Sequence, residues 1–181
     1  MKLLSIQAGR PREVQAGREI VLTSIFKLPV TGPVRVGALN IDGDEQSDLT
    51  VHGGRDKAVY FYASEHYPHW RTELPDLDFS YGAFGENFTV EGLLETEVAI
   101  GDRLEIGTAV FEVSRPRMPC YKLGVRFNRL DMVKRFHRSG RSGFYARVVR
   151  EGVVQAGDVI RLRPSSGERT TIAESVRLST A

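Results

Sequence analysis

Hydrophobic and polar residues alternate along several stretches of the chain, which is the pattern of half-buried β-strands. The clearest case is residues 108–115, where Ala109, Phe111 and Val113 fall on one face and the residues between them on the other. Apolar and β-branched residues predict further strands at 2–7, 17–30, 32–46 and, as two strands joined by a turn at 151–152, at 143–163. Many strands separated by glycine turns favour a mainly β fold, either a barrel or a sandwich.

A first helix is predicted for residues 55–74, with Asp56 as its N-cap and Pro68 near the end of its regular part. The sequence His-Gly-Gly precedes it at 52–54. Free N–H groups at a helix start favour an anion, and Lys57 adds positive charge there. The glycines are equally expected in a tight turn that needs positive φ.

A second helix is predicted for residues 130–140. Leu130, Val133 and Phe136 share one stripe of this helix, as expected for a face that packs on a core. Gly140 is typical of a helix end.

Several other polar residues receive a structural interpretation. His66 and His69 lie three residues apart, but no carboxylate at ligand spacing completes a metal site, so both are interpreted as packing or surface side chains. His137 belongs to the solvated, basic end of the second helix. Asp102 and Asp158 follow glycines and are expected to bond the backbone of their own turns.

The single cysteine, Cys120, lies in the sequence RPRMPCYKLG at 115–124. Its two neighbouring prolines predict a stiff, extended surface loop. Arg115, Arg117 and Lys122 are close enough in sequence to stabilise a thiolate, the form that attacks electrophiles and binds soft metals. The alternative is that Cys120 is a small buried hydrophobic residue.

Length and composition limit the functional classes. A chain of 181 residues forms one domain, or one domain and a tail, and 41% hydrophobic with 27% charged residues is ordinary for a globular protein. A formal charge of +2 does not point to nucleic acid. The apolar run near the N-terminus is too short for a signal peptide, and no later one could span a bilayer. A reduced, cytoplasmic setting is expected, without nucleic-acid or membrane partners.

Five motifs that follow one another in the chain resemble the MOSC domain family, named for the C-terminal domain of molybdenum cofactor sulfurases. They are GDEQSDLTVHGGRDKAVYFY, GAFGENFT, IGDRLEIG, VSRPRMPCYKLG and GFYARVVREGVVQAGD, and the likeness runs from about residue 27 to 162. Within the family the chain is most similar to the stand-alone bacterial YiiM type. The resemblance implies a mainly β (α+β) fold, a MOSC-type β-barrel with a few peripheral helices.

The resemblance also divides the chain into a MOSC domain at 1–163 and a C-terminal tail at 164–181. YiiM-type proteins often carry a helical module at this point, and the tail is too short for such a bundle. An extra strand, one helix and a disordered segment are the alternatives for it.

The resemblance further implies a bound molybdenum cofactor, a pterin dithiolene with a phosphate. Cys120 would be the catalytic and metal-binding residue, either ligating molybdenum or carrying sulfur. The residues implied to bind the cofactor are His52, Gly53, Gly54, Asp56, Lys57, Glu86, Asn87, Arg115 and Arg117. The two arginines, Lys57 and the His-Gly-Gly helix entrance would bind the phosphate, and Glu86 and Asn87 would contact the pterin or a metal oxo group. Family members are also linked to pyridoxal phosphate, for which Lys57 or Lys27 would form a Schiff base, although no spacing in this sequence argues for it.

Three functions are consistent with these implications. The first is a molybdenum-dependent reductase of small N-hydroxylated compounds that receives electrons from a separate flavin or iron–sulfur protein. The second is a sulfur carrier with a persulfide on Cys120. The third is a cofactor-binding module without turnover. The sequence contains neither a P-loop nor a dinucleotide-binding motif.

Overall fold

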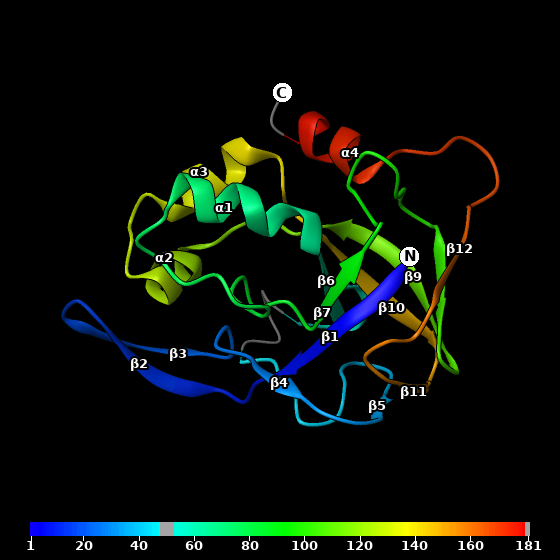
Figure 1. Ribbon diagram of the computed structural model, residues 1–181, viewed down its shortest axis with the longest axis horizontal. Coiled ribbons are helices and arrows are strands. Elements are labelled where there is room, and N and C mark those ends of the chain that lie inside the picture. Colours follow the sequence, from blue (N-terminus) through cyan, green and yellow to red (C-terminus); the bar gives the residue numbers. More distant parts are fainter. Residues whose placement is uncertain (48–52, 180–181) are drawn as a thin grey trace.

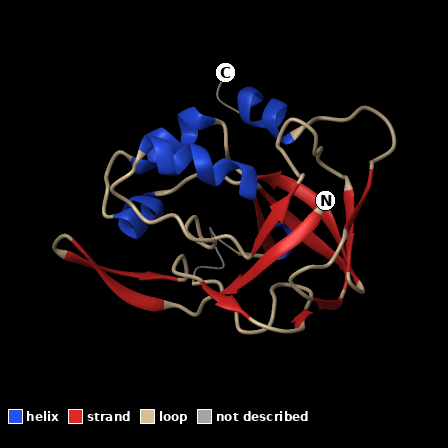
Figure 2. Ribbon diagram, in the orientation of Figure 1, coloured by secondary structure: helices blue, strands red, loops and turns tan. Residues whose placement is uncertain are grey.

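The computed structural model describes residues 1–47 and 53–179 and contains one large sheet, two small sheets and a group of helices (Figure 1, Figure 2). The strands are β1 (Lys2–Ala8), β2 (Arg12–Ala16), β3 (Glu19–Thr23), β4 (Leu28–Val30), β5 (Val34–Val36), β6 (Val59–Ala63), β7 (Phe88–Glu91), β8 (Arg103–Ile106), β9 (Ala109–Pro116), β10 (Phe144–Arg150), β11 (Gly152–Val154) and β12 (Ile160–Arg163). The helices are η1 (Arg55–Lys57), η2 (Ser64–His66), α1 (Tyr67–Glu73), α2 (Tyr121–Phe127), α3 (Met132–Ser139) and α4 (Ile172–Leu178). No described helix is long and apolar enough to cross a membrane.

The large sheet has the strand order β12-β8-β9-β10-β6-β7-β1-β4. Neighbouring strands are antiparallel except β6 and β7, which are parallel. The prediction of a closed barrel is wrong, because this sheet does not close. At the start of β1 a single bridge joins Lys2 to Val159 just before β12, whereas the end of β1 pairs with β4 from Ile6 to Ala8. The two edge strands, β12 and β4, therefore do not pair with each other.

Strand β6 lies in the middle of the sheet and is buried on both faces. Val59 and Phe61 point into one hydrophobic cluster, which fills the curved sheet, and Phe61 stacks on Phe144 at a centroid distance of 5.2 Å. Tyr60 and Tyr62 point into a second, aromatic cluster under α1, α2 and α3. Figure 1 shows these three helices gathered on one side of the sheet.

The helix predicted for 55–74 is wrong over its first half. Residues 55–57 form only the 3-10 turn η1, β6 follows, and α1 begins at Tyr67. The run from Val59 to Ala63 is rich in β-branched and aromatic residues, which favour a strand between two packed layers. Asp56 is not the N-cap of a helix, and Pro68 lies in the first turn of α1, where its missing N–H is tolerated.

The other predicted elements fare differently. Strand β9 and the end of α3 at Gly140, which has φ of 67°, are confirmed. Leu130 is fully exposed, because α3 begins two residues later. The extended loop around Cys120 is shorter than expected, since α2 begins at Tyr121. Residues 143–163 form three strands instead of the two predicted, and β11 pairs with β5 rather than with β10.

The C-terminal segment is folded against the sheet. Its helix α4 starts with a capping box formed by Thr171 and Glu174, and Ile172 is fully buried. Asp102 accepts hydrogen bonds from the backbone N–H of Ser165 at 2.9 Å and from Arg169 at 2.6 Å. Besides the expected bond within its own turn, Asp102 thus anchors residues that are more than 60 positions away.

Candidate functional site

A cavity of about 110 Å³ lies where β9 leaves the sheet toward α2. Segments that are far apart in the sequence form its wall, and they come from residues 23–27, 44–47, 57–60, 84–87 and 117–122, together with Tyr145 of β10. The cavity thus has the central strands β6 and β10 on one side and the segment around Cys120 on the other.

Cys120 lines this cavity and is half-buried. It is the residue directly before α2, with extended backbone angles of φ −124° and ψ 172°, and its carbonyl accepts a bond from the N–H of Leu123 at 3.0 Å. The prolines at 116 and 119 lead the chain from the end of β9 to this point. The thiol is therefore presented by a short, stiff connection that is fixed at both ends.

Arg117 is the second prominent residue of the cavity, and it is only 5% exposed. Its guanidinium lies over the rings of Tyr60 and Phe136, at 5.4 and 4.8 Å from their centroids. Its Nη1 is buried and has no hydrogen-bond partner among the described residues. A buried donor without a partner is costly, so an anion that enters the cavity would be stabilised by a bond from this nitrogen.

Three lysines add to the charge of the cavity. Lys27 forms a buried ion pair with Asp44, and burial lowers the pKa of this lysine. Burial and the nearby Arg115 lower the pKa of Lys57. Lys122 is buried and donates to Ser47 Oγ at 3.3 Å.

The charges of the cavity wall do not cancel. Its acidic residues are Asp44 and Glu45, against three lysines and Arg117. The backbone N–H of Gly9 also donates to Asp44 at 2.8 Å, so this carboxylate is already engaged inside the fold. The wall thus carries an excess of positive charge, which favours an anionic ligand.

The predicted anion site at a helix start is not present in this form. Gly53 and Gly54 precede the single turn η1, so no helix dipole is directed at them. Gly54 has φ of 93°, as the tight-turn alternative expects, and its N–H donates to Gln46 Oε1 at 3.1 Å. His52 lies outside the described residues.

Two other predicted residues lie outside the cavity. Asp56 is exposed and forms an ion pair with Arg147 at 3.1 Å, so it is not turned toward a ligand in the cavity. Arg115 is exposed and does not line the wall, although its charge reaches Lys57. The structure brings together Lys57, Asn87, Arg117 and Cys120 from the predicted set.

Glu86 and Asn87 support the wall from inside. Glu86 has no exposed surface, and its carboxylate accepts hydrogen bonds from Gly82 N at 2.8 Å, Phe84 N at 3.1 Å, Thr89 Oγ1 at 3.0 Å and the hydroxyl of Tyr67. Asn87 accepts from Tyr60 N and donates to the carbonyl of Gln7. The predicted contact of Glu86 with a ligand is therefore not supported, because its carboxylate oxygens accept hydrogen bonds from within the fold.

Sequence reasoning named Lys27 only as a Schiff-base lysine, and it identified neither its pairing with Asp44 nor the two tyrosines of the wall. Burial raises the pKa of Tyr60 and of Tyr145, which keeps both hydroxyls protonated. Asp44 lies inside the first of the five motifs, and this was the available signal for it. The contact of Asp44 with Lys27 depends on the fold, since 17 residues separate them.

The described residues offer few metal ligands. They contain no group of three or more His, Cys, Asp and Glu side chains that could hold a metal ion. His66 is buried and bonded to Glu95 at 2.8 Å, and His69 pairs with Glu73 at 3.0 Å. A metal beside Cys120 would therefore have to bring its other ligands with it, as a dithiolene cofactor does.

Comparison with known proteins relates this site to one family. The profile of the MOSC domain matches residues 48–161. A Bacillus subtilis (strain 168) protein named YflK is 42% identical over 167 residues, which are 92% of this chain and 75% of that protein. A Gibberella moniliformis protein named "Reductase" is 41% identical over 88% of this chain, and the match covers only 29% of that protein. The crystal structure of YiiM from Geobacillus stearothermophilus superposes with a TM-score of 0.81 at 36% identity, over 98% of this chain and 83% of that one.

Proposed function

The chain belongs to the MOSC domain family, and from this membership and the cavity we propose that it binds molybdenum cofactor and reduces N-hydroxylated compounds. The observation that carries the proposal is the pairing, in one cavity, of a half-buried thiol with a buried guanidinium that has an unpartnered nitrogen. A thiolate is a soft metal ligand, and a guanidinium binds phosphate with charge-assisted hydrogen bonds.

The residues of the cavity fit the two ends of this cofactor. Cys120 would hold the metal, and Arg117 with Lys27, Lys57 and Lys122 would hold the phosphate. The cavity of about 110 Å³ is smaller than the range of roughly 300–1,000 Å³ for a drug-sized ligand, so the pterin would extend beyond it. When bound, the cofactor would supply the two-electron redox chemistry.

The chain's own groups would bind the substrate and manage protons. Reduction of a hydroxylamine, R–NHOH, takes up two electrons and two protons, breaks the N–O bond and yields R–NH₂ and water. The buried ammonium of Lys27, whose pKa is lowered, can hold a proton close to the cavity. The protonated hydroxyl of Tyr145 can donate a hydrogen bond to the leaving oxygen, whereas the hydroxyl of Tyr60 already donates to the carbonyl of Ser142.

The electrons would come from a separate flavin or iron–sulfur protein. The sequence has one cysteine, whereas a cluster site commonly uses four. The name "Reductase" of the Gibberella moniliformis relative agrees with a redox function, although it describes a protein of which this chain spans 29%.

The test combines metal analysis with two variants. We expect purified protein to contain stoichiometric molybdenum and to reduce phenylhydroxylamine to aniline with reduced methyl viologen. Cys120→Ser replaces a soft ligand by a hard one and should abolish activity at every cofactor level. Arg117→Ala should lose roughly ten- to a hundredfold in cofactor affinity, at about 1.5–3 kcal/mol for a charge-assisted bond, and excess cofactor should restore its activity.

Two outcomes would contradict the proposal. Full activity of Cys120→Ser would remove the role of the thiol as ligand. Cyanide-releasable sulfur on Cys120, without molybdenum, would favour the sulfur-carrier alternative.

A further inference from the structure

A second hollow lies on the outer side of the helices and differs from the cavity in its residues. It is a groove of about 600 Å³ between α1 and α3, lined by basic side chains of α3 and by Arg141 just after this helix. None of its lining residues also lines the Cys120 cavity.

The acidic residues of the groove are already engaged. Arg135 binds Glu73 at 2.9 Å and Asp131 at 2.6 Å, and His69 shares Glu73. The described chain shows no ion pair for the other three cations of the groove, which are Lys134, Arg138 and Arg141. With four Lys and Arg residues against Glu73 and Asp131, the lining of the groove has an excess of two positive charges.

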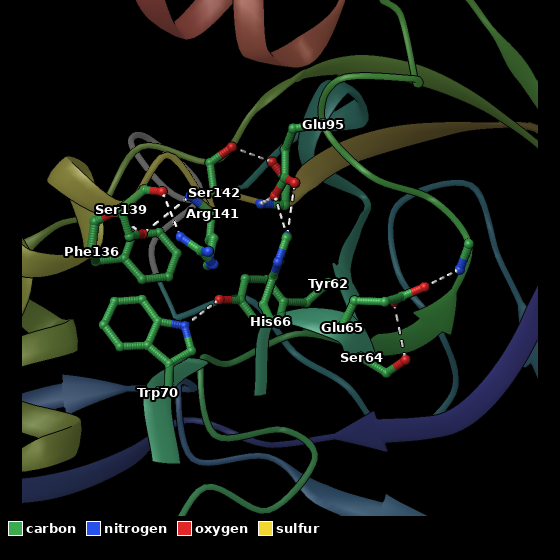
Figure 3. A network of polar contacts seen from close by, with 12 residues as sticks. Tyr62, Ser64, Glu65, His66, Trp70, Glu95, Phe136, Ser139, Arg141 and Ser142 are labelled. Carbon is green, nitrogen blue, oxygen red and sulfur yellow. Dashed lines mark hydrogen bonds and ion pairs between the residues drawn. The ribbon is translucent and has the colours of Figure 1, made fainter. Parts of the chain in front are cut away.

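A rigid loop presents Arg141 and joins the groove to the cavity. Glu95 accepts a hydrogen bond from the N–H of Gly143 at 2.6 Å. Glu95 also binds His66, as Figure 3 shows from close by. The hydroxyl of Tyr60, a residue of the cavity wall, donates to the carbonyl of Ser142 at 2.8 Å. The loop that carries Arg141 is thus fixed by Tyr60 of β6 and by Glu95 from the turn after β7.

Helix α3 separates the groove from the cavity. Its inner face carries the buried Phe136, whose ring stacks on Trp70 at 5.9 Å and lies 4.8 Å from the guanidinium of Arg117. A helix with its side chains is about 10–12 Å thick. An electron donor bound in the groove would therefore lie about one helix thickness from the cavity, with aromatic side chains between.

We propose that this groove is the docking surface for an acidic, flavin-containing electron-donor protein, an inference that rests on the proposed reductase function. Three cations without an ion pair on a fixed surface would steer a negatively charged partner and favour its binding at low salt. The fully reduced flavin would give up two electrons and two protons, and R–NHOH would take up both to form R–NH₂ and water.

The lack of aromatic residues in the groove favours an acidic protein over a single-stranded nucleic acid. Single-stranded nucleic acid is usually bound with exposed aromatic side chains on which bases stack. The residues that line the groove include no Phe, Tyr or Trp. The aromatic rings of this region are packed inside, in the second hydrophobic cluster.

The experiment measures binding and turnover separately, with flavodoxin as an acidic FMN protein. Lys134→Glu/Arg138→Glu reverses two of the three cations. Arg18→Glu/Arg161→Glu is the matched control, because it changes the net charge equally at two exposed residues elsewhere. We expect the groove variant to bind flavodoxin at least tenfold more weakly at low salt and to lose most of the salt dependence. The control should bind like the unchanged protein.

Turnover distinguishes this inference from the proposed function. With methyl viologen as donor, the groove variant should keep the kcat of the unchanged protein, while its KM for flavodoxin should rise. Weakened flavodoxin binding in a protein that reduces no hydroxylamine would support the docking surface and contradict the reductase. Equal flavodoxin binding by the groove variant and its control would overturn the docking surface. Tighter binding of a single-stranded oligonucleotide than of flavodoxin, lost in the groove variant, would overturn it in favour of a nucleic acid.

Discussion

Two buried charges near the cavity, Glu86 and Arg117, differ in how far their hydrogen-bonding groups are satisfied within the fold. Glu86 has no exposed surface, and four donors satisfy its carboxylate. Arg117 is 5% exposed, and its Nη1 lacks a partner within the described chain. Glu86 shows what a structural charge looks like here. The missing partner of Arg117 Nη1 is therefore informative, because the same region satisfies the buried carboxylate of Glu86.

The surroundings of Arg117 explain how the fold tolerates it. The rings of Tyr60 and Phe136 face the guanidinium and attract it through their π-systems. Such contacts stabilise the charge without using up its N–H groups. The carboxylate of Glu86, by contrast, accepts four hydrogen bonds from within the fold. Glu86 therefore stabilises the wall of the cavity, whereas Arg117 keeps a nitrogen that can bind a ligand.

The largest expected effect is the loss of the structural charge. Glu86→Ala should lower the free energy of unfolding by at least about 4 kcal/mol, because four buried donors lose their acceptor at roughly 1–3 kcal/mol each. Urea denaturation followed by circular dichroism measures this change. Glu65→Ala is the control, since Glu65 also accepts a backbone bond, from Gly92 at 2.7 Å, but is exposed. Equal stability of the two variants would contradict the structural role of Glu86.

The second effect concerns the available charge. Arg117→Met keeps apolar contact with the two rings and removes the guanidinium. Without an anion, its free energy of unfolding should equal or exceed that of the unchanged protein, because an unpaired buried charge is gone. Its affinity for sulfate should fall roughly ten- to a hundredfold, as expected for a charge-assisted bond. Calorimetric titration and urea denaturation measure both. A large loss of stability with unchanged sulfate affinity would reverse the comparison.

The sequence predicted parts of the fold that depend on local pattern. The alternation in β9 and the stop of α3 at Gly140 were read correctly, because each is set by neighbouring residues. Strand β6 was missed, since a strand buried on both faces has no alternation, and the polar residues on either side of it resemble helix ends. The open sheet could not be foreseen from the pattern of strands. It depends on how β4 and β12 share the edge of β1.

The sequence predicted which kinds of side chain meet at the candidate site, but it did not predict which of them face the cavity. The motif around Cys120 indicated a thiol among cations, and the structure places Arg117 and Lys122 in the same cavity. Which side chains face a ligand could not be read from the sequence. Glu86 and Asp56 are acidic residues that lie within two positions of a glycine, yet Glu86 is an internal acceptor and Asp56 is on the surface. Contacts between distant segments decide such cases.

The smallest expected effect concerns Lys27, which is intermediate between the two charges compared above. It is a buried cation like Arg117, but it has a partner in Asp44. Burial lowers its pKa below the ordinary value of a lysine, so it loses its proton earlier than an exposed lysine as the pH rises. Sulfate affinity should therefore decrease between pH 7 and 9.5, by less than tenfold, while sulfate itself keeps its charge.

Unfolding would not explain this decrease. The folded pKa of Lys27 lies below the unfolded one, so between the two values the unfolded chain binds more protons and the contribution of Lys27 to stability increases with pH. Lys27→Arg should flatten the pH dependence, because arginine stays charged over this range. Lys57→Arg is the comparison, since the pKa of Lys57 is also lowered, by burial and by Arg115. A slope that persists in Lys27→Arg and disappears in Lys57→Arg would assign the titration to Lys57. In that case Lys27 would stay protonated in its ion pair with Asp44 over this pH range, and it would be a structural charge like Glu86.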